Sequence, residues 1–287
     1  MKGIKWGFIL LAFLALGALT VVKWNAWDNS RLHLTEYTFC HQEIPKSFDG
    51  YRLLVISDLH EAPFGEQALE LIQETQPDVI LFCGDLVQLP GYSFEETQKI
   101  ARGVKNTIPM YAVSGNHESQ NPEYDHIVGN LWDEGIVWLE DDRTRLKKAG
   151  EEIVLIGMKD CGWNALPEER VREELVPKVK ELLPEDGEDF TILLSHRANL
   201  YPYFKDIGVD LILSGHMHGG LIRLPFAGGV LGRENGEFLL FPDYTYGYYH
   251  EGKAAMIVSG GCDQNEEKKR VFNPPEVVLV TLERERG

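Results

Sequence analysis

Six short apolar runs, each followed at once by polar residues, limit what this chain can fold into more than any other feature. They are RLLVISDLH (52–60), DVILFCGD (78–85), MYAVSGNHE (110–118), EIVLIGMKD (152–160), FTILLSH (190–196) and DLILSGHMH (210–218). Such runs are too short for amphipathic helices and are typical of strands buried on both faces. The intervals at 65–76 and 167–184 carry helical patterns. The sequence therefore predicts an α/β fold.

Five of these runs end in side chains of the types that bind metals in proteins. The residues are Asp58, His60, Asp85, Asn116, His117, His196, His216 and His218. Taken alone, an Asp after a strand is often a helix N-cap, and Gly-Asn is often a turn. Ligands of α/β proteins gather in the crevice beyond the carboxyl ends of the strands, so we expect these side chains to converge. Their joint occurrence favours a shared metal site over eight unrelated cap, turn or surface residues.

The pair His216 and His218 sharpens this expectation. If the run at 210–216 is a strand, alternate side chains share a face, so both imidazoles point the same way at its end. Two such imidazoles suggest a metal, while an isolated pair is more often made of ordinary surface or core histidines. The other strand ends favour the metal.

The number of candidate ligands indicates how many metal ions are held. Three side chains offer oxygen (Asp58, Asp85 and Asn116) and four offer imidazole nitrogen (His60, His196, His216 and His218). Seven ligands are too many for one ion, but they suit two ions that share a bridging carboxylate. Mixed oxygen and imidazole ligands without thiolate favour Mn²⁺, Fe or Zn²⁺ over Ca²⁺ or an iron–sulfur cluster. The sequence does not select among these metals.

Composition excludes several other classes of protein. With 44% hydrophobic and 25% charged residues, the 287-residue chain is long enough and apolar enough for one large folded domain or two small ones. The net charge of −17 argues against a nucleic-acid partner. Four scattered cysteines without a CxxC pair do not form a disulfide framework, and Cys83 lies inside an apolar run that we expect in the core.

The order of the motifs DLH, GD, GNHE, SH and GHMH resembles that of the calcineurin-like metallophosphoesterase superfamily. The patterns DLHxxxFG at 58–65, GHxHGGxxRLP at 215–225 and NPPEVVLVTL at 273–282 look most like its membrane-associated bacterial branch. That branch is similar to UDP-2,3-diacylglucosamine-type phosphohydrolases. The resemblance covers the chain from about residue 51 to its C-terminus.

This resemblance implies a four-layer α/β/β/α sandwich and a ligand set for two divalent metal ions. One ion would be held by Asp58, His60, Asp85 and His218, and the other by Asp85, Asn116, His196 and His216, with Asp85 bridging. Two cations lower the pKa of a bridging water, neutralise phosphate oxygens and align the ester for in-line attack by the resulting hydroxide. In this scheme His117 binds no metal and donates a proton to the leaving oxygen.

The sequence departs from the family pattern at three positions. Many members carry an Asp that supports the catalytic His where this chain has Gln88, so Glu118 or another carboxylate would have to take that role. Met217 stands where Thr is frequent, and the Pro that often follows the SH histidine by two is absent after His196. None of these changes removes a predicted ligand.

The first thirty residues form a separate unit in this interpretation. Residues 6–22 are uncharged and mainly apolar, about the minimum for one membrane-spanning helix, although a cleaved signal peptide fits a similar pattern. Lys2 and Lys5 precede the run and only Lys23 directly follows it, which favours a single-pass cell-membrane anchor with the larger domain outside the cytoplasm. We expect an anchor and linker over residues 1–30 and a metallophosphoesterase catalytic domain over residues 31–287.

Three functions remain open at this stage. The first is a metal-dependent hydrolase of phosphoester or pyrophosphate bonds that acts on an amphiphilic or lipid-linked phosphate. The second is a phosphodiesterase of soluble or cyclic nucleotides, and the third is a non-catalytic metal-binding scaffold on the same fold. A decayed scaffold is expected to have lost ligands, whereas all seven are present here together with His117. The sequence does not determine the oligomeric state.

Overall fold

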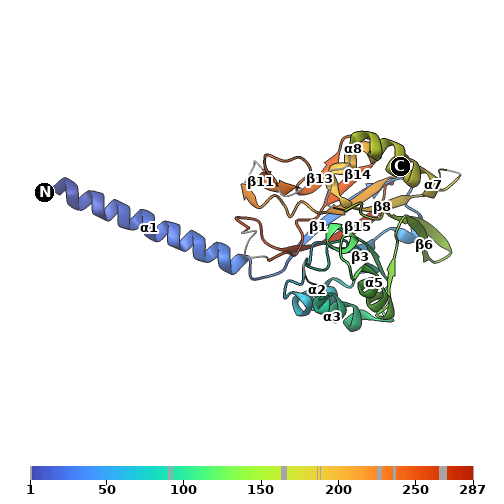
Figure 1. Ribbon diagram of the computed structural model, residues 1–287, viewed down its shortest axis with the longest axis horizontal. Coiled ribbons are helices and arrows are strands. Elements are labelled where there is room, and N and C mark those ends of the chain that lie inside the picture. The colour runs from blue at the N-terminus through green and yellow to red at the C-terminus, as the bar shows by residue number, and fades with distance from the viewer. Residues whose placement is uncertain are drawn as a thin grey trace.

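The computed structural model describes residues 2–89, 91, 93–162, 167–185, 187, 189–224, 228–234, 237–264 and 270–286. Helix α1 (Lys2–Asp28) projects away from the remaining elements, which pack together at its C-terminal end (Figure 1). Within the described residues, one segment, Ile9–Asp28, is long and apolar enough to cross a membrane, and a signal sequence would meet the same criterion. This finding matches the apolar segment that the sequence predicts.

Two six-stranded sheets form the centre of the molecule. The first has the order β1 (His33–His41), β15 (Glu276–Arg284), β2 (Tyr51–Ile56), β3 (Val79–Cys83), β4 (Met110–Val113) and β5 (Ile136–Trp138). The second has the order β13 (Gly247–His250), β14 (Ala255–Val258), β9 (Leu211–Gly215), β8 (Thr191–Arg197), β7 (Glu151–Gly157) and β6 (Asp142–Lys148). Strands β2 to β5 are mutually parallel, as are β14, β9, β8 and β7. Each parallel set therefore brings its carboxyl ends to one edge of its sheet.

Helices cover the outer face of each sheet. The first sheet carries α2 (Gly65–Thr75), α3 (Glu95–Val104) and α5 (Tyr124–Asp133), which lie together in Figure 1. The second carries η2 (Val171–Leu175), α7 (Val176–Leu182) and α8 (Tyr201–Phe204). The remaining short helices are η1 (Lys46–Phe48), α4 (Asn116–Ser119), α6 (Glu168–Arg170) and η3 (Ala198–Leu200). The predicted four-layer α/β/β/α order is therefore confirmed.

The packing explains why the strands read as continuous apolar runs. Along β2, Leu53 and Val55 join the core between the two sheets, whereas Leu54 and Ile56 join the core beneath the helices. Because both faces are covered, every position of β2 except the half-buried Arg52 is buried, and each buried aliphatic side chain contributes roughly 1.5–3 kcal/mol of transfer free energy. Cys83 is fully buried between the sheets, as expected.

A third, smaller sheet lies beside this sandwich. It consists of β10 (Ile222–Leu224), β11 (Gly228–Glu234) and β12 (Glu237–Leu240), joined as antiparallel neighbours. A parallel bridge between Ile222 and Val271 connects it to the segment that leads into β15. The segment that follows the GHMHGG turn thus forms a sheet of its own.

Candidate metal centre

The eight predicted site residues lie at the carboxyl ends of strands from both main sheets. Asp58 and His60 follow β2, Asp85 follows β3, Asn116 and His117 begin α4 directly after β4, His196 lies near the end of β8, and His216 and His218 follow β9. His216 is partly exposed and the other seven residues are buried. The fold thus brings together side chains that span 160 residues of sequence.

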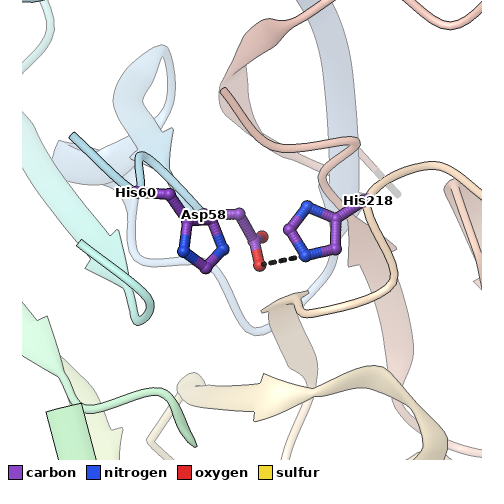
Figure 2. Close-up of side chains that lie close together, drawn as sticks. All are labelled: Asp58, His60 and His218. Carbon is purple, nitrogen blue, oxygen red and sulfur yellow. Dashed lines mark ion pairs between the residues drawn. The ribbon is translucent and has the colours of Figure 1, made fainter. Parts of the chain in front are cut away.

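One group of side chains contains Asp58, His60 and His218 (Figure 2). Their possible ligand atoms all lie within 4.8 Å of one another. His218 Nε2 is 3.8 Å from Asp58 Oδ1, and the rings of His60 and His218 are stacked with centroids 5.1 Å apart. Because two imidazoles and a carboxylate converge on one point, the group suits a divalent cation.

A second group contains Asp85, His196 and His216, again with ligand atoms within 4.8 Å of one another. His196 Nε2 lies 3.3 Å from Asp85 Oδ2 and 3.2 Å from His216 Nδ1. The other nitrogen of His196, Nδ1, is 2.7 Å from the carbonyl oxygen of Cys83. Since a carbonyl only accepts, Nδ1 must carry a proton, and Nε2 is the nitrogen that faces the site.

Asp85 lies between the two groups. Its Oδ2 is 3.3 Å from His196 Nε2 and 3.6 Å from His60 Nε2, so one carboxylate reaches a histidine of each group. Its Oδ1 accepts a hydrogen bond of 2.8 Å from the backbone N–H of His117. This is the position that a carboxylate shared by two cations needs.

Asn116 offers a further observation that fits a metal. Its side-chain Oδ1 is buried and has no hydrogen-bond partner within the described part of the chain. A buried amide oxygen without a partner costs about 1–3 kcal/mol, which a cation ligand would offset. The residues present therefore fit two divalent cations both in the chemistry of their donors and in this unsatisfied oxygen.

The buried carboxylates and imidazoles of the site shift one another's pKa values. Burial raises the pKa of Asp58 to about 6. Burial also opposes ionisation of Asp85, but His196, His117 and His60 outweigh it and hold the Asp85 pKa well below its usual range. Burial lowers the pKa of His196, yet the attraction of Asp85 raises it to about 10. The carboxylate between the two groups is thus ionised at neutral pH.

The backbone at the site is unusual. Asp58, His60, Asp85, His216 and His218 all have φ between 45° and 74°, in the left-handed region that side chains rarely adopt. Such conformations cost on the order of 1 kcal/mol each or more and cluster at functional sites. Gly115, before Asn116, and Gly215, before His216, are required as well. A Cβ on Gly115 would overlap Asp85, and one on Gly215 would overlap Asp58.

The left-handed turn at His216 corrects one step of the sequence argument. Strand β9 ends at Gly215, so neither histidine of the HxH pair belongs to a strand and the parity argument for a shared face is wrong. Both residues have positive φ, 74° at His216 and 48° at His218, which redirects the chain between them. His216 accordingly joins the group with Asp85, while His218 joins the group with Asp58.

The loop after β3 surrounds His117. The carboxylate of Glu118 accepts backbone N–H groups of this loop. Gln88 donates to the carbonyl of Leu89. The backbone N–H of Leu89 donates to His117 Nδ1 at 3.0 Å, which places the ring proton on Nε2. That nitrogen faces Asp85 Oδ2 at 4.0 Å.

Sequence reasoning missed Asp263, whose Oδ2 lies 3.5 Å from His218 Nδ1. It follows the apolar strand β14, so the rule that located the other residues, a carboxylate after a buried run, applies to it too. Asp160, which follows β7, accepts a hydrogen bond of 2.8 Å from Arg197 Nε, and Arg197 Nη1 lies 3.4 Å from His216 Nε2. Asp263 therefore lies beside a predicted metal ligand, and Asp160 is linked to another through Arg197.

Comparison with known proteins agrees with this geometry. The family model for calcineurin-like phosphoesterases matches residues 51–220. The uncharacterized metallophosphoesterase YkuE of Bacillus subtilis is 26% identical over 94% of this chain and 93% of its own length, and the phosphodiesterase YaeI of Escherichia coli is 26% identical over 62% and 64%. The crystal structure of TT1561 of Thermus thermophilus aligns with a TM-score of 0.47 at 16% identity, over 74% of this chain and 90% of that one. The family match covers more than half of the chain and every predicted ligand, so this protein belongs to the calcineurin-like phosphoesterase family and is a metal-dependent phosphoesterase with a dinuclear divalent metal centre.

Proposed function

We propose that this phosphoesterase hydrolyses a phosphodiester or pyrophosphate bond of an amphiphilic, lipid-linked phosphate. The observation that carries the reaction class is the convergence of ligand atoms from five strand ends, with Asp85 between two groups of histidines. Two divalent ions, when bound, supply Lewis acidity that activates water and neutralises phosphate charge. The catalytic unit would be residues 31–287, as the sequence predicts.

In this proposal Asp58, His60, Asp85 and His218 hold one ion, and Asp85, Asn116, His196 and His216 hold the other. The 3.8 Å separation of His218 from Asp58 and the 3.2 Å separation of His196 from His216 support the division. The unsatisfied Oδ1 of Asn116 supports its role as a ligand. Substitution of His216 or His218 should therefore empty one metal position in preference to the other.

His117 is the proposed catalytic residue. The Leu89 N–H keeps the proton of its neutral ring on Nε2, the nitrogen that faces Asp85 and therefore the site. From this position the imidazole can donate a hydrogen bond to a phosphoryl or leaving-group oxygen. The same backbone donor disfavours an additional proton on Nδ1, so we propose that His117 stabilises charge more than it transfers a full proton.

Two observations support a membrane-associated, lipid-linked substrate. Helix α1 contains the one described segment that can span a membrane, and Trp24 and Trp27, 46% and 53% exposed, lie in its last turns, where interfacial aromatic residues are common. The three-stranded sheet carries exposed Leu224, Leu240 and, next to it, Phe241. A β-bridge joins Ile222 of this sheet to Val271. The rings of Trp24 and Phe272, the residue after Val271, have centroids 5.9 Å apart. We propose that this apolar surface rests on the bilayer that holds α1.

The alternatives are distinguished by substrate. YaeI is named a phosphodiesterase, which supports the diester class but not a lipid. A soluble or cyclic-nucleotide phosphodiesterase that is tethered by α1 would carry the same metal centre. A non-catalytic scaffold is opposed by the complete set of seven ligands together with His117.

The test is a substrate panel on full-length protein in detergent micelles, loaded with Mn²⁺, with an aryl diester, a cyclic nucleotide and a lipid pyrophosphate. We expect the highest kcat/KM for the lipid pyrophosphate. His117→Ala should keep two metals and lose roughly 10²- to 10⁴-fold in kcat for alkyl leaving groups, while His126→Ala, on the exposed surface of α5, should match wild type. A higher kcat/KM for the cyclic nucleotide would refute the lipid assignment, and full activity of His117→Ala would refute the role of His117.

A further inference from the structure

Arg270 is a buried cation whose guanidinium lacks hydrogen-bond partners. Arg270 is only 4% exposed and lies in the segment that leads into β15. Neither Nη1 nor Nη2 has a hydrogen-bond partner among the residues that the structure describes. A buried charge in this state is strongly destabilising, so such a group is expected to meet a ligand.

Arg197 shows what a structural arginine of this fold looks like. It is 5% exposed, nearly as buried as Arg270. Its Nε donates to Asp160 at 2.8 Å, and its Nη2 donates to Asp160 and to the carbonyl of Gly162. The chain thus satisfies one buried guanidinium fully and leaves two nitrogens of the other unsatisfied.

Contacts of its neighbours place Arg270 beside the metal centre. Asn273, three residues further on, donates to the carbonyl of His218 at 2.7 Å. Burial lowers the pKa of Arg270, and the negative charges of Asp263 and Asp58 oppose that shift. Asp263 in turn lies 3.5 Å from His218. The segment that carries Arg270 therefore lies next to the group formed by Asp58, His60 and His218.

The last turn of α1 fixes the backbone at Arg270. The side-chain amides of Asn25 and Asn29 both donate to the Arg270 carbonyl, at 2.9 and 2.8 Å. Asn25 Oδ1 also accepts the backbone N–H of Phe272 at 2.8 Å. Two hydrogen bonds thus join Asn25, in the last turn of α1, and Asn29, just after it, to Arg270, and a third joins Asn25 to Phe272.

We infer that Arg270 binds a phosphate oxygen of the substrate and that the last turn of α1 positions it for this contact. The inference rests on the proposed function and adds a substrate-binding residue to it. A guanidinium binds phosphate through two parallel N–H···O bonds, and Arg270 has both terminal nitrogens available. The phosphate can be the one that is cleaved or the second phosphate of a pyrophosphate, and the experiment separates these sources.

The experiment measures binding of inorganic phosphate and of a non-hydrolysable pyrophosphate analogue, methylene diphosphonate, by calorimetry. It uses full-length, metal-loaded protein in detergent micelles. Arg270→Met should weaken binding on the order of 10- to 100-fold, and Arg270→Lys should lose less because it keeps the charge without the paired bonds. Arg145→Met, which removes the same charge from a surface ion pair with Asp189, should bind like wild type. Metal content should stay at two ions per chain in every variant.

A further variant tests the positioning by α1. The double variant Asn25→Ala with Asn29→Ala should weaken phosphate binding several-fold while metal content is unchanged. If Arg270→Met weakens binding of both probes, Arg270 contacts the phosphate that is cleaved. If it weakens binding of the diphosphonate alone, Arg270 contacts the second phosphate of the pyrophosphate. Unchanged affinity for both probes would overturn the inference, as would loss of metal in Arg270→Met. If Arg270→Met does not fold, unchanged affinity of Arg270→Lys for both probes would refute the inference.

Failure of this inference is distinguishable from failure of the proposed function. If wild type cleaves the lipid pyrophosphate and Arg270→Met does so with the same KM and the same phosphate affinity, only the role of Arg270 is wrong. If wild type binds phosphate through Arg270 but cleaves no member of the substrate panel, the proposed function is wrong and the binding site stands.

Discussion

The carboxylate of Glu118 is the most heavily used hydrogen-bond acceptor around the metal centre, and replacing it with an amide is a stringent test. Its Oε2 accepts the backbone N–H groups of Asp85 and Gly115 at 2.8 and 2.7 Å. Its Oε1 accepts those of Leu86 and Val87 at 2.7 and 2.9 Å. The side chain is fully buried, so water cannot replace it. One carboxylate thus joins the loop after β3 to the turn that begins α4.

The size of the effect follows from the geometry. In Glu118→Gln one oxygen remains as an acceptor, while the amide –NH₂ faces two backbone donors. Two buried N–H groups are then unsatisfied, at about 1–3 kcal/mol each, so the free energy of unfolding should fall by about 2–6 kcal/mol. Both joined segments carry predicted ligands, Asp85 and Asn116, so we also expect a loss of metal affinity.

The assay is urea unfolding of the metal-free protein followed by far-UV circular dichroism, with metal content of the loaded protein measured separately. Glu134→Gln is the matched control, because Glu134 forms a surface ion pair with Arg102 that contributes about 0–1 kcal/mol. If Glu118→Gln is destabilised no more than Glu134→Gln, the carboxylate does not hold these segments together and the reasoning is refuted.

Two further predictions concern backbone space and pH. Gly115→Ala places a Cβ against Asp85 and should cost about 1–3 kcal/mol and lower metal content, whereas Gly129→Ala in α5, with nothing within 4 Å of the new Cβ, should be neutral or stabilising by about 0.5–1 kcal/mol in the same urea assay. Equal stability of the two variants would contradict this. Burial raises the pKa of Asp210 from 3.8 to about 6, so the folded protein binds more protons than the unfolded chain between these values and its stability falls as pH rises through them. Asp210→Asn should therefore gain about 1–3 kcal/mol relative to wild type between pH 4 and pH 7, and parallel pH profiles of the two proteins would show that this group does not titrate as described.

The fold and the position of the site follow from local features of the sequence. Strands such as β2 and β3 are buried on both faces, at every position of β3 and at every position of β2 except Arg52. The carboxyl ends of parallel strands share an edge, so Asp58 and Asp85 could be placed together without any knowledge of the angles between elements. Asp263 obeys the same rule after β14 and was missed only because no recognised motif marks it.

Other features depend on partners that the sequence does not pair. Glu118 is one carboxylate that could support His117 by the sequence alone, but only the structure shows that it accepts backbone N–H groups of the loop after β3. The isolation of Arg270 cannot be read from the chain either, since it concerns contacts that are missing rather than present. The link from Asn25 to Arg270 joins positions 245 residues apart. Such pairings require the three-dimensional structure.

The HxH pair shows why a correct expectation of convergence can rest on the wrong local geometry. A continued strand would have set His216 and His218 side by side, and two adjacent imidazoles would then have suited a single ion. Because β9 ends at Gly215 and both histidines adopt positive φ, the chain turns between them, and each ring enters a different group of ligands. These turns thus let one short motif reach both groups of candidate ligands, so the strained backbone contributes to the predicted dinuclear site along with the ligands themselves.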